Sequence, residues 1–183
     1  MATKRTVILG ITGSIAAYKA ADLASQLKKC GHDVFCVMTP SATRFITPLT
    51  LHTLTQHPVL VDLFDAGEGD WRPSHLAVAD SADLLVIAPA TANIIAKLAL
   101  GIADDALSTL ALALRPEAKV LIGPAMNGKM WEHAATQANV RVLQSRGVEF
   151  IGPEKGLLAC GYEGLGRLWA VDQIAERIRQ MLA

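Results

Sequence analysis

The chain has 183 residues, a length that suits one domain with a substantial core. Its 17 basic and 17 acidic residues cancel to a net charge of zero, which excludes a broad charged surface for nucleic acid or an anionic membrane. Hydrophobic residues make up 51% and charged residues only 19%, so we expect part of the apolar surface to be buried in a homo-oligomer.

The cysteines and the N-terminal segment indicate a cytoplasmic protein. Cys30, Cys36 and Cys160 form no C-x-x-C pair and are odd in number, which argues against a disulfide framework and a thiolate metal site. The N-terminus leads into a short apolar run without a signal or transit pattern. The uncharged stretch from Leu84 to Ala96 is shorter than the about 20 residues that span a bilayer. We therefore expect no metal and no membrane span.

Short apolar runs alternate with longer stretches of helical periodicity along the whole chain. The runs are almost continuously hydrophobic, a pattern typical of strands that are buried on both faces of a parallel sheet. The sequence therefore predicts one doubly wound α/β domain over residues 1–183, Rossmann-like or flavodoxin-like. The expected strands are Val7–Ile11, Val34–Met38, Leu84–Ala88, Val120–Ile122 and Val148–Ile151.

Capping residues and terminal glycines outline the helices. Ser14 is a suitable N-cap for the first helix, and Gly31 is a suitable stop. Gly101 separates the second and third helices, and Gly147 follows the fourth. The expected helices are Ile15–Cys30, Thr91–Leu98, Asp104–Leu114, Lys129–Arg146 and Val171–Met181.

The turn after the first strand carries glycines at Gly10 and Gly13, followed by Ser14 and Ile15. Free backbone N–H groups at such a turn favour an anionic ligand. Thr12 occupies the place where the dinucleotide fingerprint needs its second glycine, so a mononucleotide such as FMN is favoured over NAD. The alternative is a tight turn in which Ser14 only caps its helix.

Hydroxyls, small residues and amides also follow the next strands, where open α/β sheets bind ligands. Thr39 and Ser41 come after the second strand, the segment Thr91–Ile94 after the third, and the segment Ala125–Asn127 after the fourth. Asn127 could orient a carboxylate through its amide. Thr91 and Asn127 could instead be ordinary N-caps of the helices that follow them.

Two further segments carry reactive side chains. A loop rich in Gly, Asp and Trp, Ala66–Pro73, leads to His75 at the start of a helix, where an imidazole could act as a base or cap the helix. Residues 156–167 contain four glycines around Cys160 and end at Arg167. Such a segment predicts a mobile flap with a thiol and a guanidinium, or a plain surface turn.

Five segments together resemble the homo-oligomeric flavin-containing cysteine decarboxylases, in particular those that act on 4′-phosphopantothenoylcysteine. They are Gly13–Lys19, His75, the run from Pro89 to Leu98, Pro124–Asn127 and Ala159–Gly161. The resemblance covers about Val7 to Arg167. It implies an FMN protein of coenzyme A biosynthesis that assembles as trimers or as dodecamers of four trimers, with flavin sites at subunit contacts.

The resemblance also implies roles for residues at the matching positions. His75 is the base, Cys160 in the flap is the proton donor, and Asn127 binds the substrate carboxylate with help from Ala159, Gly161 and Arg167. Ile94 stands where many relatives have threonine, so a side-chain hydrogen bond to flavin is in doubt there. The implied flavin contacts are Gly13, Ser14, Ile15, Thr39, Ser41, Thr91, Ala92, Asn93, Ile94, Ala125 and Met126.

The implied reaction begins with oxidation of the cysteinyl carbon to a thioaldehyde, because a plain cysteinyl carbanion has no electron sink. Loss of CO₂ and re-reduction, with Cys160 as proton donor, then give 4′-phosphopantetheine. The alternatives are an oxidative decarboxylase of a peptide C-terminal cysteine, a flavin prenyltransferase, and a non-catalytic flavin-binding subunit. The Ala159–Gly161 flap together with Arg167 disfavours the first, and His75 together with Asn127 disfavours the second.

Overall fold

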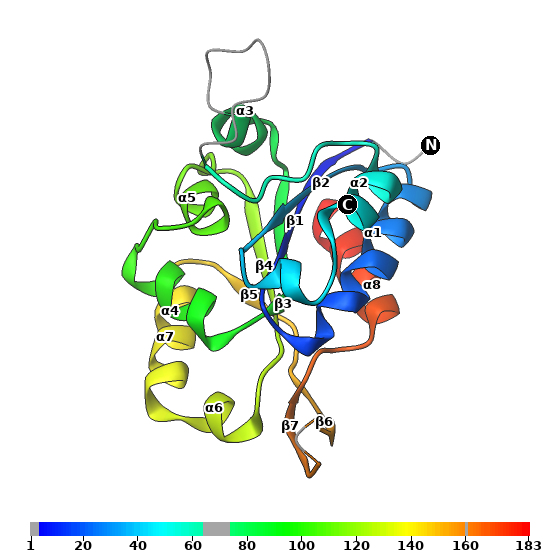
Figure 1. The fold of residues 1–183 in the computed structure, drawn as a ribbon. Coiled ribbons are helices and arrows are strands. Elements are labelled where there is room, and N and C mark those ends of the chain that lie inside the picture. The colour runs from blue at the N-terminus through cyan, green and yellow to red at the C-terminus, as the bar shows by residue number, and fades with distance from the viewer. Residues whose placement is uncertain (1–3, 64–73, 160) are drawn as a thin grey trace.

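A five-stranded parallel sheet of order β2-β1-β3-β4-β5 forms the centre of the computed structural model (Figure 1). The structure describes residues 4–63, 74–159 and 161–183. This strand order is that of flavodoxin-like proteins, so the predicted doubly wound α/β class is confirmed. The strands are β1 (Thr6–Ile11), β2 (Asp33–Met38), β3 (Leu84–Ala90), β4 (Lys119–Pro124) and β5 (Glu149–Phe150).

Continuous hydrophobicity in the strands reflects burial on both faces of the sheet. In β1, Val7, Leu9 and Ile11 point into one core cluster, whereas Ile8 points into the other, and all four are fully buried. β3 is buried along its whole length for the same reason. Side chains that alternate between two covered faces leave no position for a polar residue, as expected for a parallel sheet.

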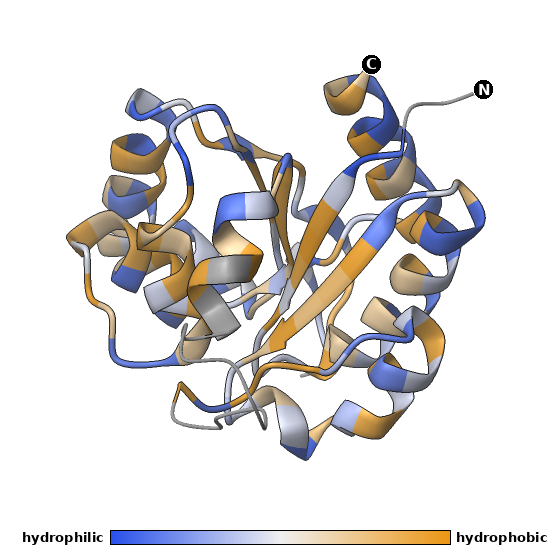
Figure 2. Cartoon of the chain, turned by 90° about the horizontal axis from the view of Figure 1, so that it is seen from above, coloured by the Kyte–Doolittle hydropathy of each residue, from blue (hydrophilic) through white to orange (hydrophobic). Residues whose placement is uncertain are grey.

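Helices cover both faces of the sheet, and its apolar strands lie between them (Figure 2). One layer contains α1 (Lys19–Lys29), α2 (Pro48–Thr55) and α8 (Val171–Leu182). The other contains α3 (Ser74–Ser81), α4 (Ala92–Leu100), α5 (Ala106–Leu112) and α7 (Ala134–Ser145). In the described part of the chain, no helix is long and apolar enough to cross a membrane.

Two predicted helices are divided in the structure. The first begins as a 3₁₀ turn, η1 (Ile15–Tyr18), which buries Ala16 and Ala17, and α1 follows it. The predicted helix 129–146 is divided into α6 (Gly128–Glu132) and α7 by the extended backbone of His133. The His133 ring accepts from the N–H of Ala135 at 3.2 Å, so this residue caps α7 instead of continuing α6.

The structure also contains η2 (Ala42–Arg44) and α2, which the sequence pattern did not predict. α2 buries Leu51 but leaves Leu49 70% exposed, so its apolar residues do not form one helical stripe.

The glycine-rich segment predicted as a loop is a two-stranded antiparallel hairpin, β6 (Glu154–Leu157) and β7 (Glu163–Arg167). It extends beyond the carboxyl edge of the main sheet (Figure 1). Gly156 faces Gly164 in its register, so the ribbon is narrow at that point. Backbone pairing, which glycine does not prevent, accounts for the difference from the predicted loop.

Candidate active site

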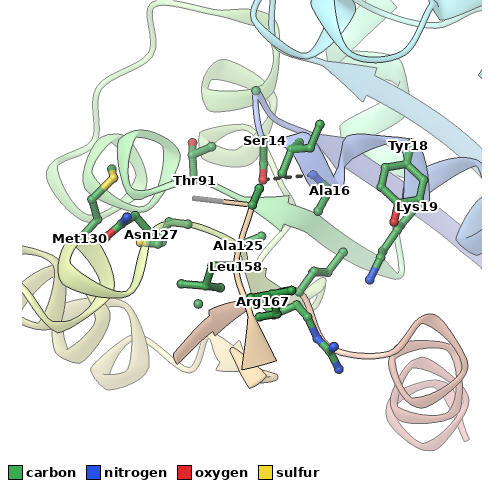
Figure 3. Close-up of a pocket in the computed structure, with 17 residues that line it drawn as sticks. Ser14, Ala16, Tyr18, Lys19, Thr91, Ala125, Asn127, Met130, Leu158 and Arg167 are labelled. Atoms are coloured by element: carbon green, nitrogen blue, oxygen red, sulfur yellow. Dashed lines mark hydrogen bonds between the residues drawn. The ribbon is translucent and has the colours of Figure 1, made fainter. Parts of the chain in front are cut away.

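A pocket of about 490 Å³ lies at the carboxyl edge of the sheet, between η1, the turn after β4 and the β6–β7 hairpin (Figure 3). Segments that are far apart in the sequence therefore meet where parallel α/β sheets bind ligands. The lining residues are Gly13, Ser14, Ile15, Ala16, Tyr18, Lys19, Thr91, Ala125, Met126, Asn127, Met130, Leu157, Leu158, Ala159, Gly166, Arg167 and Leu168.

Thr12 connects the two turns at the centre of the sheet edge. Its buried hydroxyl donates to the carbonyl of Pro89 at 2.8 Å and accepts from the N–H of Thr91 at 3.0 Å. β1 lies between β2 and β3, so these turns flank the point where the strand order reverses. A glycine at this position, as in a dinucleotide fingerprint, would remove both hydrogen bonds.

Gly13, Thr39 and Ser41, which we call the cradle, belong to the turns after β1 and β2. Gly13 lines the pocket, whereas Thr39 and Ser41 are not among the lining residues. A Cβ added to Gly13 would lie 2.5 Å from the Cβ of Ser41, so only glycine fits against the turn that follows β2. Thr39 is 8% exposed, and its buried hydroxyl has no hydrogen-bond partner among the described residues. A buried hydroxyl without a partner costs about 1–3 kcal/mol. A ligand oxygen at this place would remove that cost.

The segment after β3 is only partly in the pocket. Thr91 lines it and also caps α4, because its hydroxyl accepts from the N–H of Ile94 at 3.4 Å. Ile94 is 1% exposed and packs in the core, while Ala92 and Asn93 are not among the lining residues. The flavin contacts predicted for these three residues stay predictions.

Asn127 is both a helix cap and a pocket residue. It caps α6, because its Oδ1 accepts from the N–H of Lys129 at 2.9 Å, and it also lines the pocket with Ala125 and Met126. The same Oδ1 accepts from the Tyr162 hydroxyl of the hairpin at 2.9 Å. The amide is therefore held from its own helix and from the opposite wall of the pocket.

The hairpin supplies Ala159 and Arg167 to the pocket, and their contacts with a substrate stay predictions. The guanidinium of Arg167 is half exposed and forms a 2.8 Å ion pair with Glu154 across the hairpin. Gly161, at a backbone φ of +86°, is exposed and does not line the pocket. Cys160 lies outside the described residues.

His75 does not lie near this pocket in the same chain. It is in the first turn of α3, at the opposite end of the sheet from the β6–β7 hairpin (Figure 1). α3 packs against α5, and its side chain at position 75 is outside what the structure describes. The predicted role of His75 as a base stays a prediction.

The sequence pattern did not predict Tyr18, Lys19 or Tyr162 as functional candidates. Tyr18 and Lys19 follow Gly13 within the segment that carries the resemblance, but only the tight η1 turn directs them to the pocket rim (Figure 3). Lys19 has no ion pair among the described residues. Tyr162 carries no sequence signal, because its partner Asn127 is 35 residues away.

Cys36 is a core residue. Burial raises the pKa of its thiol to about 12, so it packs as a small hydrophobe. Among the described residues, no group of three His, Cys, Asp or Glu side chains could hold a metal ion.

Solved structures related to this chain share its fold over almost the full length. A PPC decarboxylase mutant complexed with pantothenoylaminoethenethiol has a TM-score of 0.86 at 30% identity, and covers 97% of this chain and 98% of its own. The FMN binding protein AtHal3 has a TM-score of 0.83 at 30% identity, with 97% of this chain and 96% of its own covered.

Curated relatives and a family model agree with the structural matches. The coenzyme A biosynthesis bifunctional protein CoaBC of Bacillus subtilis is 47% identical over 96% of this chain, which spans 43% of that relative's length. A probable phosphopantothenoylcysteine decarboxylase of Streptococcus mutans is 43% identical over 97% of this chain and 99% of its own. The model of the Flavoprotein family matches residues 1–183, and the chain therefore belongs to that family.

Proposed function

We propose that this chain is an FMN-dependent decarboxylase that converts 4′-phosphopantothenoylcysteine to 4′-phosphopantetheine in coenzyme A biosynthesis. The names of the relatives from Bacillus subtilis and Streptococcus mutans support the pathway and the reaction. The observation that carries the proposal is the position of Asn127. Its amide lines a pocket that is also lined by Gly13, at the turn after β1, and by residues of the β6–β7 hairpin.

The cradle fits the polar part of FMN. Thr39 offers a buried hydroxyl that has no partner in the described part of the chain, and Gly13 leaves the space that a side chain would take from Ser41. FMN, when bound, supplies an acceptor for the electron pair of the sulfur-bearing carbon and returns that pair after CO₂ has left. The other proposed contacts are Ser14, Ile15, Thr91, Ala92, Asn93, Ile94, Ala125 and Met126.

The remaining site residues would handle the substrate. Asn127 would donate to the substrate carboxylate and orient the bond that breaks. Arg167 and Lys19 line the same pocket and give it positive charge that suits a phosphorylated substrate. Ala159 and Gly161 would enclose it from the hairpin. Cys160 would donate the proton to the carbon from which CO₂ has departed.

His75 would serve the pocket of a neighbouring copy, because α3 and the pocket are at opposite ends of the sheet. A homo-oligomer, a trimer or a dodecamer of trimers, is therefore part of the proposal. Exposed apolar side chains provide surface for such contacts. They include Leu49, Leu100, Ile102 and Leu112. A cytoplasmic location is also proposed, in keeping with the free thiols of Cys30 and Cys36.

Two mass measurements test this function. The pigment released from the purified protein should have the mass of FMN, and incubation with 4′-phosphopantothenoylcysteine should give 4′-phosphopantetheine and CO₂. Asn127→Asp is the matched control: it should keep the pigment and lose turnover, because its carboxylate repels that of the substrate. A protein that binds no flavin, or a flavin-loaded protein that leaves the substrate unchanged, would contradict the proposal.

The peptide alternative from the sequence can be tested in the same assay. The FMN-dependent cysteine decarboxylase SpaF has a TM-score of 0.80 at 32% identity and covers 100% of this chain and 99% of its own, and its name specifies no substrate beyond cysteine. A peptide with a C-terminal cysteine should therefore be tested beside the small substrate. Turnover of the peptide alone would replace the proposed substrate and keep the proposed chemistry.

A further inference from the structure

The side chain of Thr12 extends the pairing of β1 and β3 beyond their last backbone pair. That pair joins Gly10 and Ile87, and Thr12 and Pro89 are each two positions further along the chain. Proline has no N–H, so Pro89 can supply only its carbonyl to a partner. The carbonyl of Thr12 is already engaged, because it accepts from the N–H of Ser14 at 2.8 Å. The contact between the two segments therefore depends on the Thr12 hydroxyl.

This hydroxyl forms two hydrogen bonds to the end of β3 and the residue after it. It donates to the carbonyl of Pro89 at 2.8 Å and accepts from the N–H of Thr91 at 3.0 Å, as only a group that both donates and accepts can do. Thr12 is 1% exposed, and its bond to Pro89 is buried. Without the hydroxyl, a buried carbonyl would lose its partner, which is more costly than the loss of an exposed hydrogen bond.

The end of β3 is irregular on the side of β4. The β3–β4 register shifts between Ile87 and Ala90, so regular pairing is interrupted just before the turn. The N–H of Ala125 donates to the carbonyl of Ala90 at 2.9 Å and links this turn to the turn after β4. The position of residues 89–91 thus depends on separate hydrogen bonds, two of which come from Thr12.

The turn after β3 places Thr91 at the pocket. Thr91 is the N-cap of α4 and a lining residue, and Ser14 lines the same pocket from the turn after β1 (Figure 3). Thr12 itself is not among the lining residues. The Thr12 hydroxyl therefore acts on a ligand in the pocket through Thr91 and not by direct contact.

We propose that Thr12 is a positioning residue for cofactor binding, whose hydroxyl fixes the turn after β3 before the cofactor binds. The inference rests on the proposed function, because it assigns the pocket to FMN. A turn that is already in place needs no ordering when the ligand binds, and this raises affinity. A turn that moves freely is competent to bind for only a fraction of the time, and the apparent Kd rises in inverse proportion to that fraction.

Thr12→Val removes the hydroxyl, nearly keeps the shape of the side chain, and tests the proposal. The Kd for FMN should rise about tenfold, in keeping with the loss of two hydrogen bonds that hold the turn. Fluorescence titration of the flavin-free protein measures it. Thr12→Ser keeps the hydroxyl, so its Kd should stay within about twofold of the wild-type value.

Thr55→Val is the matched control. The Thr55 hydroxyl is also buried, donates to the carbonyl of Leu51 at 2.9 Å and accepts from the N–H of His57 at 3.4 Å, but Thr55 does not line the pocket. The affinity for FMN should therefore be unchanged in this variant. Three results would overturn the proposal: a wild-type Kd in Thr12→Val, an equal loss in Thr12→Ser, or an equal loss in Thr55→Val.

Hydrogen exchange in the flavin-free protein separates a failure of this inference from a failure of the proposed function. The amide of Thr91 should be protected in the wild type, because it donates to Oγ1 of Thr12, and should exchange at least about tenfold faster in Thr12→Val. Equal exchange in the two proteins would overturn the positioning role. So would an unprotected Thr91 amide in the wild type, a result that needs no variant. A wild-type protein that binds no FMN would instead contradict the proposed function.

Discussion

The two walls of the pocket are built in different ways. The wall formed by Gly13 and Thr91 belongs to turns that directly follow strands of one parallel sheet, and Thr12 connects these turns. The hairpin wall lies outside that sheet. Its described polar contacts to the sheet edge go to the turn after β4, and they are the Met126–Gly166 and Tyr162–Asn127 hydrogen bonds.

Because of this difference, we expect one wall of the site to be rigid and the hairpin wall to be adaptable. Turns between buried parallel strands have little freedom, so the first wall is suited to hold a cofactor in place. A hairpin held by few contacts can be perturbed without loss of the core. Substitutions in the first wall should therefore alter cofactor binding, and those in the hairpin should alter substrate handling.

Among the substitutions that test this difference between the walls, Gly166→Ala should cause the largest loss of activity. Its Cβ would lie 2.1 Å from the carbonyl oxygen of Met126, a backbone atom that cannot move away cheaply. The hairpin should detach, and kcat/KM should fall at least about a hundredfold, since small displacements of positioning groups have effects of this size. Bound flavin and the melting temperature should change little. Leu165→Ala, at the neighbouring exposed position, is the control. Near-normal turnover of Gly166→Ala would show that the position of the hairpin does not depend on the close contact between Gly166 and Met126.

Gly13→Ala should act on the first wall instead. The added Cβ would lie 2.5 Å from that of Ser41, and overpacking of this kind typically costs about 1–3 kcal/mol. We expect flavin affinity to fall about tenfold, measured by fluorescence titration of the flavin-free protein. Adding Ser41→Gly removes the opposing Cβ and should restore part of the affinity. Normal flavin binding by the single variant would contradict the proposed position of the flavin site at Gly13.

Thr39→Val should preserve or raise the stability of the flavin-free protein but weaken flavin binding. Valine has nearly the same shape but no hydroxyl, so it removes a buried polar group that has no partner. The flavin-free protein should melt at the same or a higher temperature, while flavin affinity should fall about fivefold. Thermal melts with and without flavin measure both effects. A less stable flavin-free variant would indicate that the hydroxyl has a structural role.

Asp33→Asn, remote from both walls, should have the smallest effect. A hydrogen bond with His57 at 2.8 Å, and secondarily the charges of His57, Lys4 and Lys28, hold the pKa of Asp33 below its usual value. A lowered pKa contributes stability at neutral pH that is lost as the pH falls through that lowered pKa. The pair is partly exposed, so the variant should lose less than about 1 kcal/mol at pH 7.

The difference in unfolding free energy between wild type and Asp33→Asn should shrink below about pH 4. Denaturant melts across pH 3 to 7 measure it, with Asp80→Asn on the exposed side of α3 as the control. A difference that grows on acidification would have the wrong sign for a lowered pKa.

The sequence predicted those parts of the site that depend on local pattern. Ser14 and Thr91 cap the elements that follow their strands, and Asn127 caps α6, because capping requires only short-range hydrogen bonds. The break at His133 was missed, since the long stretch 129–146 carries no glycine or proline at that point. The hairpin was missed because its pairing is a backbone property that glycine-rich composition does not report.

Continuous apolar runs by themselves determined that the strands are parallel and buried, and with that the edge at which a ligand binds. Burial on both faces favours apolar residues along the whole of each strand, and this pattern is visible in the sequence from Val7 to Ile122. The tertiary structure alone decided that Tyr162 reaches Asn127, that Thr39 keeps a hydroxyl without a partner, and that α3 lies away from the pocket. These features depend on single contacts between distant segments, and such contacts leave no periodic signal in the chain.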